Sequence, residues 1–156
     1  MNAFSNNALK AYSMVGIETA VPSASPQQLI LLLYEGAISA ISSAQHHLRQ
    51  KDIAAKGGAI SKAISIIDGG LKASLDLNVG GDLAKSLFEL YAYMSRRLLQ
   101  ANLNNDHAAL DEVRQLLLQL KGAWETLAAN PAAAAATAGP GTPPQLRRVA
   151  TTYGSV

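Results

Sequence analysis

The stretch from residue 83 to residue 127 consists of two amphipathic segments separated by a short polar turn at residues 102–106. In both segments apolar side chains recur every three or four residues, which is the spacing of one face of an α-helix. This main stripe is Leu83, Leu87, Leu90, Tyr91, Met94, Leu98 and Ala101 in the first segment and Leu110, Val113, Leu116, Leu117, Leu120, Trp124 and Leu127 in the second. The pattern predicts a helical hairpin that must pack on other helices, because neither helix can bury its stripe alone.

Two further helices are predicted upstream of the hairpin. Ser25 is a good N-cap, Pro26 suits the first helical position, and Gln28 completes a capping box, so a helix should run from there to about residue 49. Asp52 can cap a second helix over residues 53–75. The 156 residues are 49% apolar and only 5% aromatic, which is typical of a single helical domain. We therefore predict an all-α fold, an antiparallel up-down four-helix bundle.

The chain divides into three regions. Residues 1–24 are predicted to form a flexible N-terminal arm with at most a short helix near Leu9 and Tyr12. Residues 25–128 form the bundle, and residues 129–156 form a Pro/Ala/Gly-rich tail that we expect to be disordered because it has little apolar surface to bury. Leu29, Leu31 and Leu32 make the start of the first bundle helix apolar on all sides, and the arm is the nearest segment that can cover it.

Charge and hydropathy exclude several classes of protein. The formal net charge is +2, and the excess lies in the tail at Arg147 and Arg148, so a nucleic-acid binder that also uses Arg96 and Arg97 is the weakest interpretation. The longest apolar run, residues 29–33, is far below the roughly 20 residues that cross a bilayer. We expect no membrane insertion, no signal peptide and a cytoplasmic location.

No group of side chains in the sequence predicts catalysis. The carboxylates lie on separate helices, and the adjacent His46 and His47 point about 100° apart on a helix, which is poor geometry for one metal ion. The glycine pairs match no phosphate loop. We expect no catalytic residues, no metal site and no cofactor, and therefore no enzyme.

Some apolar residues lie off the main stripes in rows of their own, the surplus rows, and these residues are informative about binding. Phe88, Ala92 and Leu99 form such a row on the third helix, and a second row on the preceding helix contains Ala59, Ile66, Ala73 and Leu77. Two rows on neighbouring helices can line one groove that accepts an amphipathic helix. The alternative, which the pattern leaves open, is that they only widen the core contact.

Several segments match one known family in order and spacing. They are LKAY at 9–12, SASPQQLI at 23–30, LYEGA at 33–37, KAISIID at 62–68, GGDLA at 80–84, LYAYM at 90–94 and RRLLQAN at 96–102. On these segments the chain resembles the FliS family of flagellar secretion chaperones from about residue 9 to residue 127. The tail has no counterpart in the resemblance.

The resemblance implies a cytoplasmic antiparallel four-helix bundle that binds the disordered C-terminal segment of flagellin, prevents premature polymerisation and delivers flagellin to the flagellar type III export apparatus. It also implies that the arm with Leu9 and Tyr12 lies over the apolar groove and takes part in partner exchange. Together with the surplus rows, it predicts the partner-binding residues Leu9, Tyr12, Leu29, Leu32, Ala59, Ile66, Ala73, Leu77, Phe88, Ala92 and Leu99.

On this hypothesis, aspartate at Ile66 or Leu99 should weaken client binding while the bundle stays folded. The alternative function is a self-associating helical structural module without a flagellin client, in which the same rows form a weak homodimer.

Overall fold

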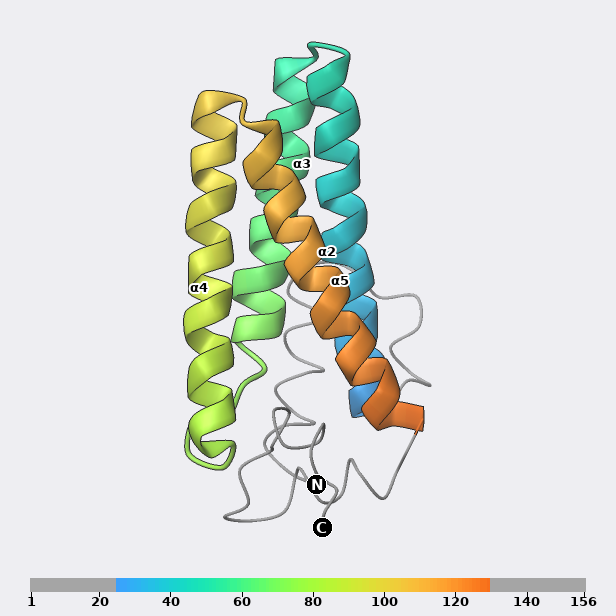
Figure 1. The fold of residues 1–156 in the computed structure, drawn as a ribbon, viewed down its shortest axis with the longest axis vertical. Helices are drawn as coiled ribbons and strands as arrows, with labels where there is room; N and C mark the ends of the chain where they lie inside the picture. The colour runs from blue at the N-terminus through green and yellow to red at the C-terminus, as the bar shows by residue number, and fades with distance from the viewer. Residues whose placement is uncertain (1–24, 130–156) are drawn as a thin grey trace.

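The computed structural model describes residues 25–129, which form four α-helices and one π-helical segment (Figure 1). The elements are α2 (Pro26–Arg49), α3 (Ile53–Ile66), η2 (Ile67–Lys72), α4 (Gly81–Asn104) and α5 (His107–Ala129). α2 packs against α3 and α5, while α4 packs against η2 and α5. The expected all-helical bundle is confirmed. The predicted arm with Leu9 and Tyr12 and the predicted tail from residue 130 lie outside the described residues.

The helix starts follow from local hydrogen bonds. The Ser25 hydroxyl accepts the Gln28 N–H at 3.2 Å and the Gln28 side chain accepts the Ser25 N–H at 2.9 Å, which confirms the predicted capping box. Asp52 caps α3 by accepting the Ala55 N–H at 3.1 Å. α4 begins at Gly81 with Gly80 as its N-cap and has no side-chain cap, because Asp82, the acidic residue that a cap would need, lies within its first turn.

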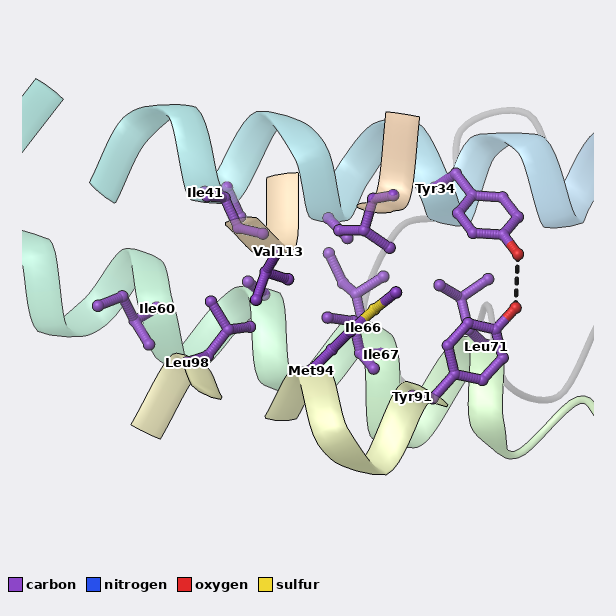
Figure 2. Close-up of a cluster of buried hydrophobic side chains, with 14 of the residues drawn as sticks. Tyr34, Ile41, Ile60, Ile66, Ile67, Leu71, Tyr91, Met94, Leu98 and Val113 are labelled. Carbon is purple, nitrogen blue, oxygen red and sulfur yellow. Dashed lines mark hydrogen bonds between the residues drawn. The ribbon is translucent and has the colours of Figure 1, made fainter. Parts of the chain in front are cut away.

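The main stripes of the four helices meet in one core (Figure 2). Met94, Leu98 and Val113 are fully buried, as the hairpin pattern predicts. The hydroxyl groups of Tyr34 and Tyr91 are joined by a hydrogen bond of 2.5 Å inside this core, so neither buried phenol is left without a partner. Burial raises the pKa of Tyr34 to about 12 and that of Tyr91 well above its usual value.

The second helix departs from the prediction in its last third. A single α-helix was expected to continue to about Leu75, but α3 ends at Ile66 and continues as the π-helix η2, which contains Gly69 and Gly70. A Cβ atom on Gly70 would lie 3.0 Å from Cδ2 of Leu33, so glycine lets η2 approach α2 closely. The wider π turn changes the direction in which residues after Ile66 point.

A buried lysine holds the end of α4 against α3. Lys56 is only 1% exposed, and its Nζ donates hydrogen bonds to the Asn102 backbone carbonyl at 2.8 Å and to Asn102 Oδ1 at 2.7 Å. The cation therefore satisfies a carbonyl in the last turn of α4, where the negative end of the helix dipole favours positive charge. The sequence pattern did not predict this contact.

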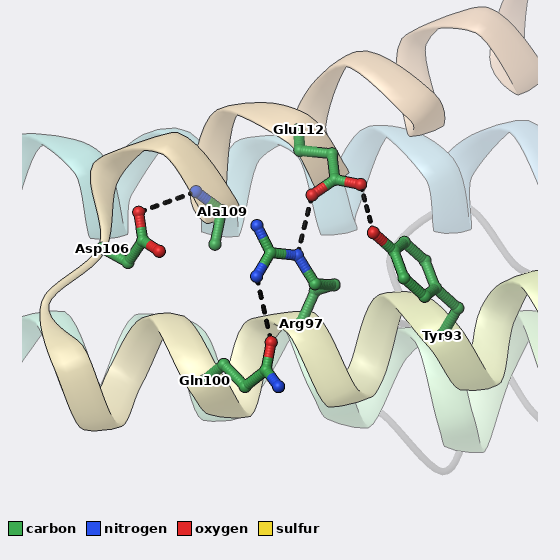
Figure 3. Close-up of polar contacts among 6 residues, drawn as sticks. All are labelled: Tyr93, Arg97, Gln100, Asp106, Ala109 and Glu112. Atoms are coloured by element: carbon green, nitrogen blue, oxygen red, sulfur yellow. Dashed lines mark hydrogen bonds and ion pairs between the residues drawn. The ribbon is translucent and has the colours of Figure 1, made fainter.

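A polar network joins α4 to α5 on the side of α4 away from η2 (Figure 3). Glu112 accepts hydrogen bonds from the Tyr93 hydroxyl and, at 2.7 Å, from Arg97 Nε. Arg97 also donates to the Gln100 side chain at 3.0 Å. The hydrogen bond from Tyr93 and that from Arg97 lower the pKa of Glu112.

This network predicts a pH-dependent contribution to stability. Because the pKa of Glu112 is lower in the folded chain than in the unfolded chain, its carboxylate stabilises the fold at neutral pH, and that contribution is lost as pH falls through the folded-state pKa. We expect Glu112→Gln to lower the free energy of unfolding at pH 7 by at most about 1 kcal/mol, since the site is partly solvated, and by less at about pH 3. Urea unfolding at both pH values measures this. A loss of equal size at both would contradict the assignment.

Candidate protein-binding surface

α4 carries a row of exposed apolar side chains on its outer side. Phe88, Ala92, Leu99 and Leu103 lie at helical spacing within an arc of about 60°, and we call them the α4 stripe. Leu103 is 81% exposed, Leu99 is 52% exposed and Phe88 is 37% exposed, while Ala92 is partly buried. An apolar row of this length on the solvent side of a helix typically marks a contact with another molecule.

The polar contacts of α4 place the α4 stripe on the side next to η2. Ser95 lies on that side and donates a hydrogen bond of 2.7 Å to Asp68 of η2. The Lys72 ammonium lies 5.0 Å from the centre of the Phe88 ring. On the other side, the Tyr93–Arg97–Glu112 network leads to α5. The α4 stripe therefore lies next to η2, whereas α5 packs on the opposite side of α4.

The connection from η2 into α4 adds further exposed apolar side chains. Leu77 is 49% exposed, Val79 is exposed, and Ala73 is exposed just after η2. The Asp76 carboxylate accepts the backbone N–H groups of Asn78 and Val79, which fixes this turn. Of the predicted partner-binding residues, Ala73, Leu77, Phe88, Ala92 and Leu99 thus belong to α4 or to the chain leading into it.

Two predicted site residues lie in the core instead. Ile66 is completely buried and Leu29 is 1% exposed, so the expectation that they form part of a free surface is wrong. Ile66 is buried because α3 contacts both α2 and α4, which widens its buried arc beyond one stripe. Leu29 faces the core in the first turns of α2, and the neighbouring Leu32 is partly buried against the same core.

Ala59 lies on a different face from the α4 stripe. It lines a surface hollow of about 450 Å³ between α2 and α3, and the other lining residues are Gly36, Ser39, Ala40, Ser43, His47, Ala55, Gly58 and Lys62. The predicted row through Ala59, Ile66 and Ala73 is therefore divided among a hollow, the core and an exposed turn, and it does not line one groove with α4.

Two exposed residues were missed in the sequence. Leu103 follows Leu99 by four residues and extends the row Phe88, Ala92, Leu99 by one turn, so continuing the same periodicity would have found it. Val79 lies in a turn outside any helical period, and no periodic signal marks it. Leu118 of α5 is also exposed, but it stands apart from the α4 stripe on another helix.

Within residues 25–129, no group of three or more histidine or carboxylate side chains is placed to hold a metal ion. None of the helices described there is both long enough and apolar enough to span a membrane. Arg97 is engaged by Glu112 and Gln100, which leaves Arg96 as the exposed member of that pair. The α4 stripe is therefore the main candidate site on the described part of the chain.

Comparison with known proteins identifies the family. The model of the family described as "Flagellar protein FliS" matches residues 8–131. The chain belongs to the FliS family. That family is one of flagellar secretion chaperones and not of enzymes.

Known relatives can be aligned with this chain along most of their length. The flagellar secretion chaperone FliS of Salmonella typhimurium is 53% identical over 124 residues, which cover 80% of this chain and 92% of the relative. FliS of Escherichia coli is 43% identical over 78% of this chain and 90% of its own length. The flagellar secretion chaperone FliSB of Pseudomonas aeruginosa is 43% identical over 78% of this chain and 96% of its own length.

Proposed function

We propose that this FliS-family chain is a flagellar export chaperone that binds the disordered C-terminal segment of flagellin. The observation that supports this most is the α4 stripe, an exposed apolar row on a protein of a secretion-chaperone family. Phe88 and Leu103 are 15 residues apart, so the row is about 22 Å long and matches roughly four turns of a guest helix.

Binding a disordered client has a known energetic requirement. Ordering the segment costs about 2–5 kcal/mol, and such complexes usually bury on the order of 1,000–3,000 Å² of surface. An extended apolar row meets this requirement through spaced anchors in the helix-in-groove mode of recognition. Leu99 and Leu103 at one end and Phe88 at the other are the anchors we assign to this chain.

The remaining parts of the proposal rest on the resemblance to the family. The chaperone acts in the cytoplasm, prevents premature flagellin polymerisation and delivers the client to the flagellar type III export apparatus. The N-terminal arm with Leu9 and Tyr12 covers the α4 stripe until a client replaces it. The antiparallel up-down arrangement of the bundle is likewise what the resemblance implies.

Calorimetric titration of the full chain with a peptide of the flagellin C-terminal segment tests the proposal. We expect binding at micromolar concentrations or tighter, a strongly negative heat-capacity change from apolar burial, and a gain of helical circular dichroism as the peptide folds. No detectable binding at micromolar concentrations would contradict the proposed function.

A self-associating structural module remains the alternative, because the α4 stripes of two copies can pair with each other. Sedimentation over a concentration series separates the two functions. A client-binding chaperone should remain monomeric or only weakly dimeric at the concentrations at which it binds flagellin, whereas a structural module should assemble without any client.

A further inference from the structure

A polar cluster borders the α4 stripe where η2 meets α4. Asp68 Oδ1 accepts a hydrogen bond of 2.7 Å from the Ser95 hydroxyl and lies 3.5 Å from Lys72 Nζ. The same Nζ lies 5.0 Å from the centre of the Phe88 ring, within the range of a cation–π contact. Lys72 therefore lies between a carboxylate of its own helical segment and an aromatic ring of the α4 stripe.

Both members of this ion pair belong to the π-helical segment η2. Asp68 and Lys72 are the second and last residues of η2, and both reach toward α4. π-helical segments are rare, and they occur frequently at functional sites. Here the segment places a cation at the edge of an exposed apolar row.

Lys72 is held only weakly in the free chain. Its distance of 3.5 Å from Asp68 is longer than the roughly 2.7–2.9 Å of a strong charge-assisted hydrogen bond. Asp68 also has a second, shorter contact with Ser95, so its carboxylate stays satisfied if Lys72 moves. An ion pair of this partly exposed kind contributes little to stability, and the ammonium group is free to change partner at small cost.

Other charged groups lie around the α4 stripe. Lys85 and Arg96 are exposed on the outer edge of the same face of α4, and Glu89 is the acidic residue between them. Asp68 is already paired on the inner edge. Asp82 is also exposed beside Glu89, so the charges at this border are mixed, and Lys72 is the cation that lies next to Phe88, where it can complement a carboxylate on a guest helix.

We propose that Lys72 binds a carboxylate of the client helix, next to the apolar anchor that packs on Phe88. This inference rests on the proposed function, because the client is the flagellin C-terminal segment. On binding, the ammonium leaves Asp68 for the client's carboxylate, and the Phe88 ring that it covered becomes available to the anchor. Lys72 is then a specificity-determining residue that sets the register of the client along α4.

Lys72→Met is the direct test, because methionine keeps the unbranched apolar stem and removes the charge. We expect the affinity for the flagellin peptide to fall by roughly three- to tenfold, and to depend less on salt between about 50 mM and about 300 mM. Lys62→Met is the matched control, since Lys62 lines the hollow between α2 and α3 and its replacement should leave both quantities unchanged.

Asp68→Asn adds a prediction of opposite sign. The amide oxygen can still accept the Ser95 hydroxyl, but Lys72 loses its anionic partner in the free chain. We expect Asp68→Asn to bind the peptide at least as tightly as the wild type does, with an affinity up to roughly fivefold higher, because Lys72 no longer has to leave a carboxylate. A purely structural role of the pair would make Asp68→Asn weaken binding as Lys72→Met does.

The outcomes separate the two proposals. If the wild-type chain fails to bind the peptide, the proposed function fails. If the wild type binds but Lys72→Met leaves affinity and salt dependence unchanged, or if Asp68→Asn weakens binding, the role of Lys72 is overturned while the function stands. Replacing the peptide's acidic residues one at a time by amides should identify one position at which the Lys72→Met effect disappears.

Discussion

Replacing Leu99 by aspartate should lower the affinity for the flagellin C-terminal segment by at least about 30-fold, or about 2 kcal/mol. Leu99 is 52% exposed in the C-terminal half of the α4 stripe, so the four-helix bundle has little packing there to lose. A client helix that buries this position would have to desolvate a carboxylate with no partner. The bundle itself should stay folded, and calorimetric titration gives the affinity.

Leu118→Asp is the matched control for Leu99→Asp. Leu118 is also a partly exposed leucine in the middle of a helix, but it belongs to α5 and lies outside the α4 stripe. Both substitutions carry the same small cost in helix propensity. Equal affinities of wild type and Leu99→Asp, or an equally large loss in Leu118→Asp, would refute the assignment of the α4 stripe as the client site.

Replacing Ile66 by aspartate should unfold the bundle rather than act on binding. Ile66 is completely buried beside Ile67 and Met94 (Figure 2). Losing a buried isoleucine costs about 2–5 kcal/mol, and an unpaired buried carboxylate adds several more, against a typical total of about 5–15 kcal/mol. We expect no cooperative thermal transition at neutral pH, or one lowered by tens of degrees, measured by circular dichroism.

Ile53→Asp controls for the chemical change at Ile66. Ile53 is the first residue of α3 and is half exposed, and a carboxylate in the first turn of a helix is favourable. The free energy of unfolding of the Ile53→Asp variant should stay within about 0.5 kcal/mol of that of the wild type. If Ile66→Asp kept wild-type stability and lost only client binding, Ile66 would not be part of the core of the chain in solution.

The helical content and the helix starts could be predicted because their causes are local. Ser25 and Asp52 cap the helices that follow them by accepting backbone N–H groups three residues away, and these groups are fixed by the sequence itself. The stripe through Tyr91, Met94 and Leu98 is likewise a property of one helix. The π turn at residues 67–72 could not be predicted, because it depends on how closely Gly70 packs against Leu33 of another helix.

The α4 stripe could be predicted in part. Phe88 and Leu99 stand out because α4 has a clear polar side and these residues interrupt it. The predicted row on the second helix was wrong at Ile66, which is buried. Periodicity does not reveal how many neighbours a helix has, and α3 packs against both α2 and α4. Tertiary contacts such as Lys72 with Phe88, or Lys56 with Asn102, join residues distant in sequence, so no single-segment pattern contains them.

A dye placed on the α4 stripe measures the central claim most directly. The sequence contains no cysteine, so Leu103→Cys gives one labelling site on the α4 stripe, Leu118→Cys one on α5, and Ser43→Cys one in the α2–α3 hollow. On saturation with the flagellin C-terminal segment, an environment-sensitive dye at residue 103 should shift its emission to shorter wavelength, and by more than at the other two sites. Saturated binding with no shift at residue 103 would contradict the assignment of the α4 stripe as the client-binding surface.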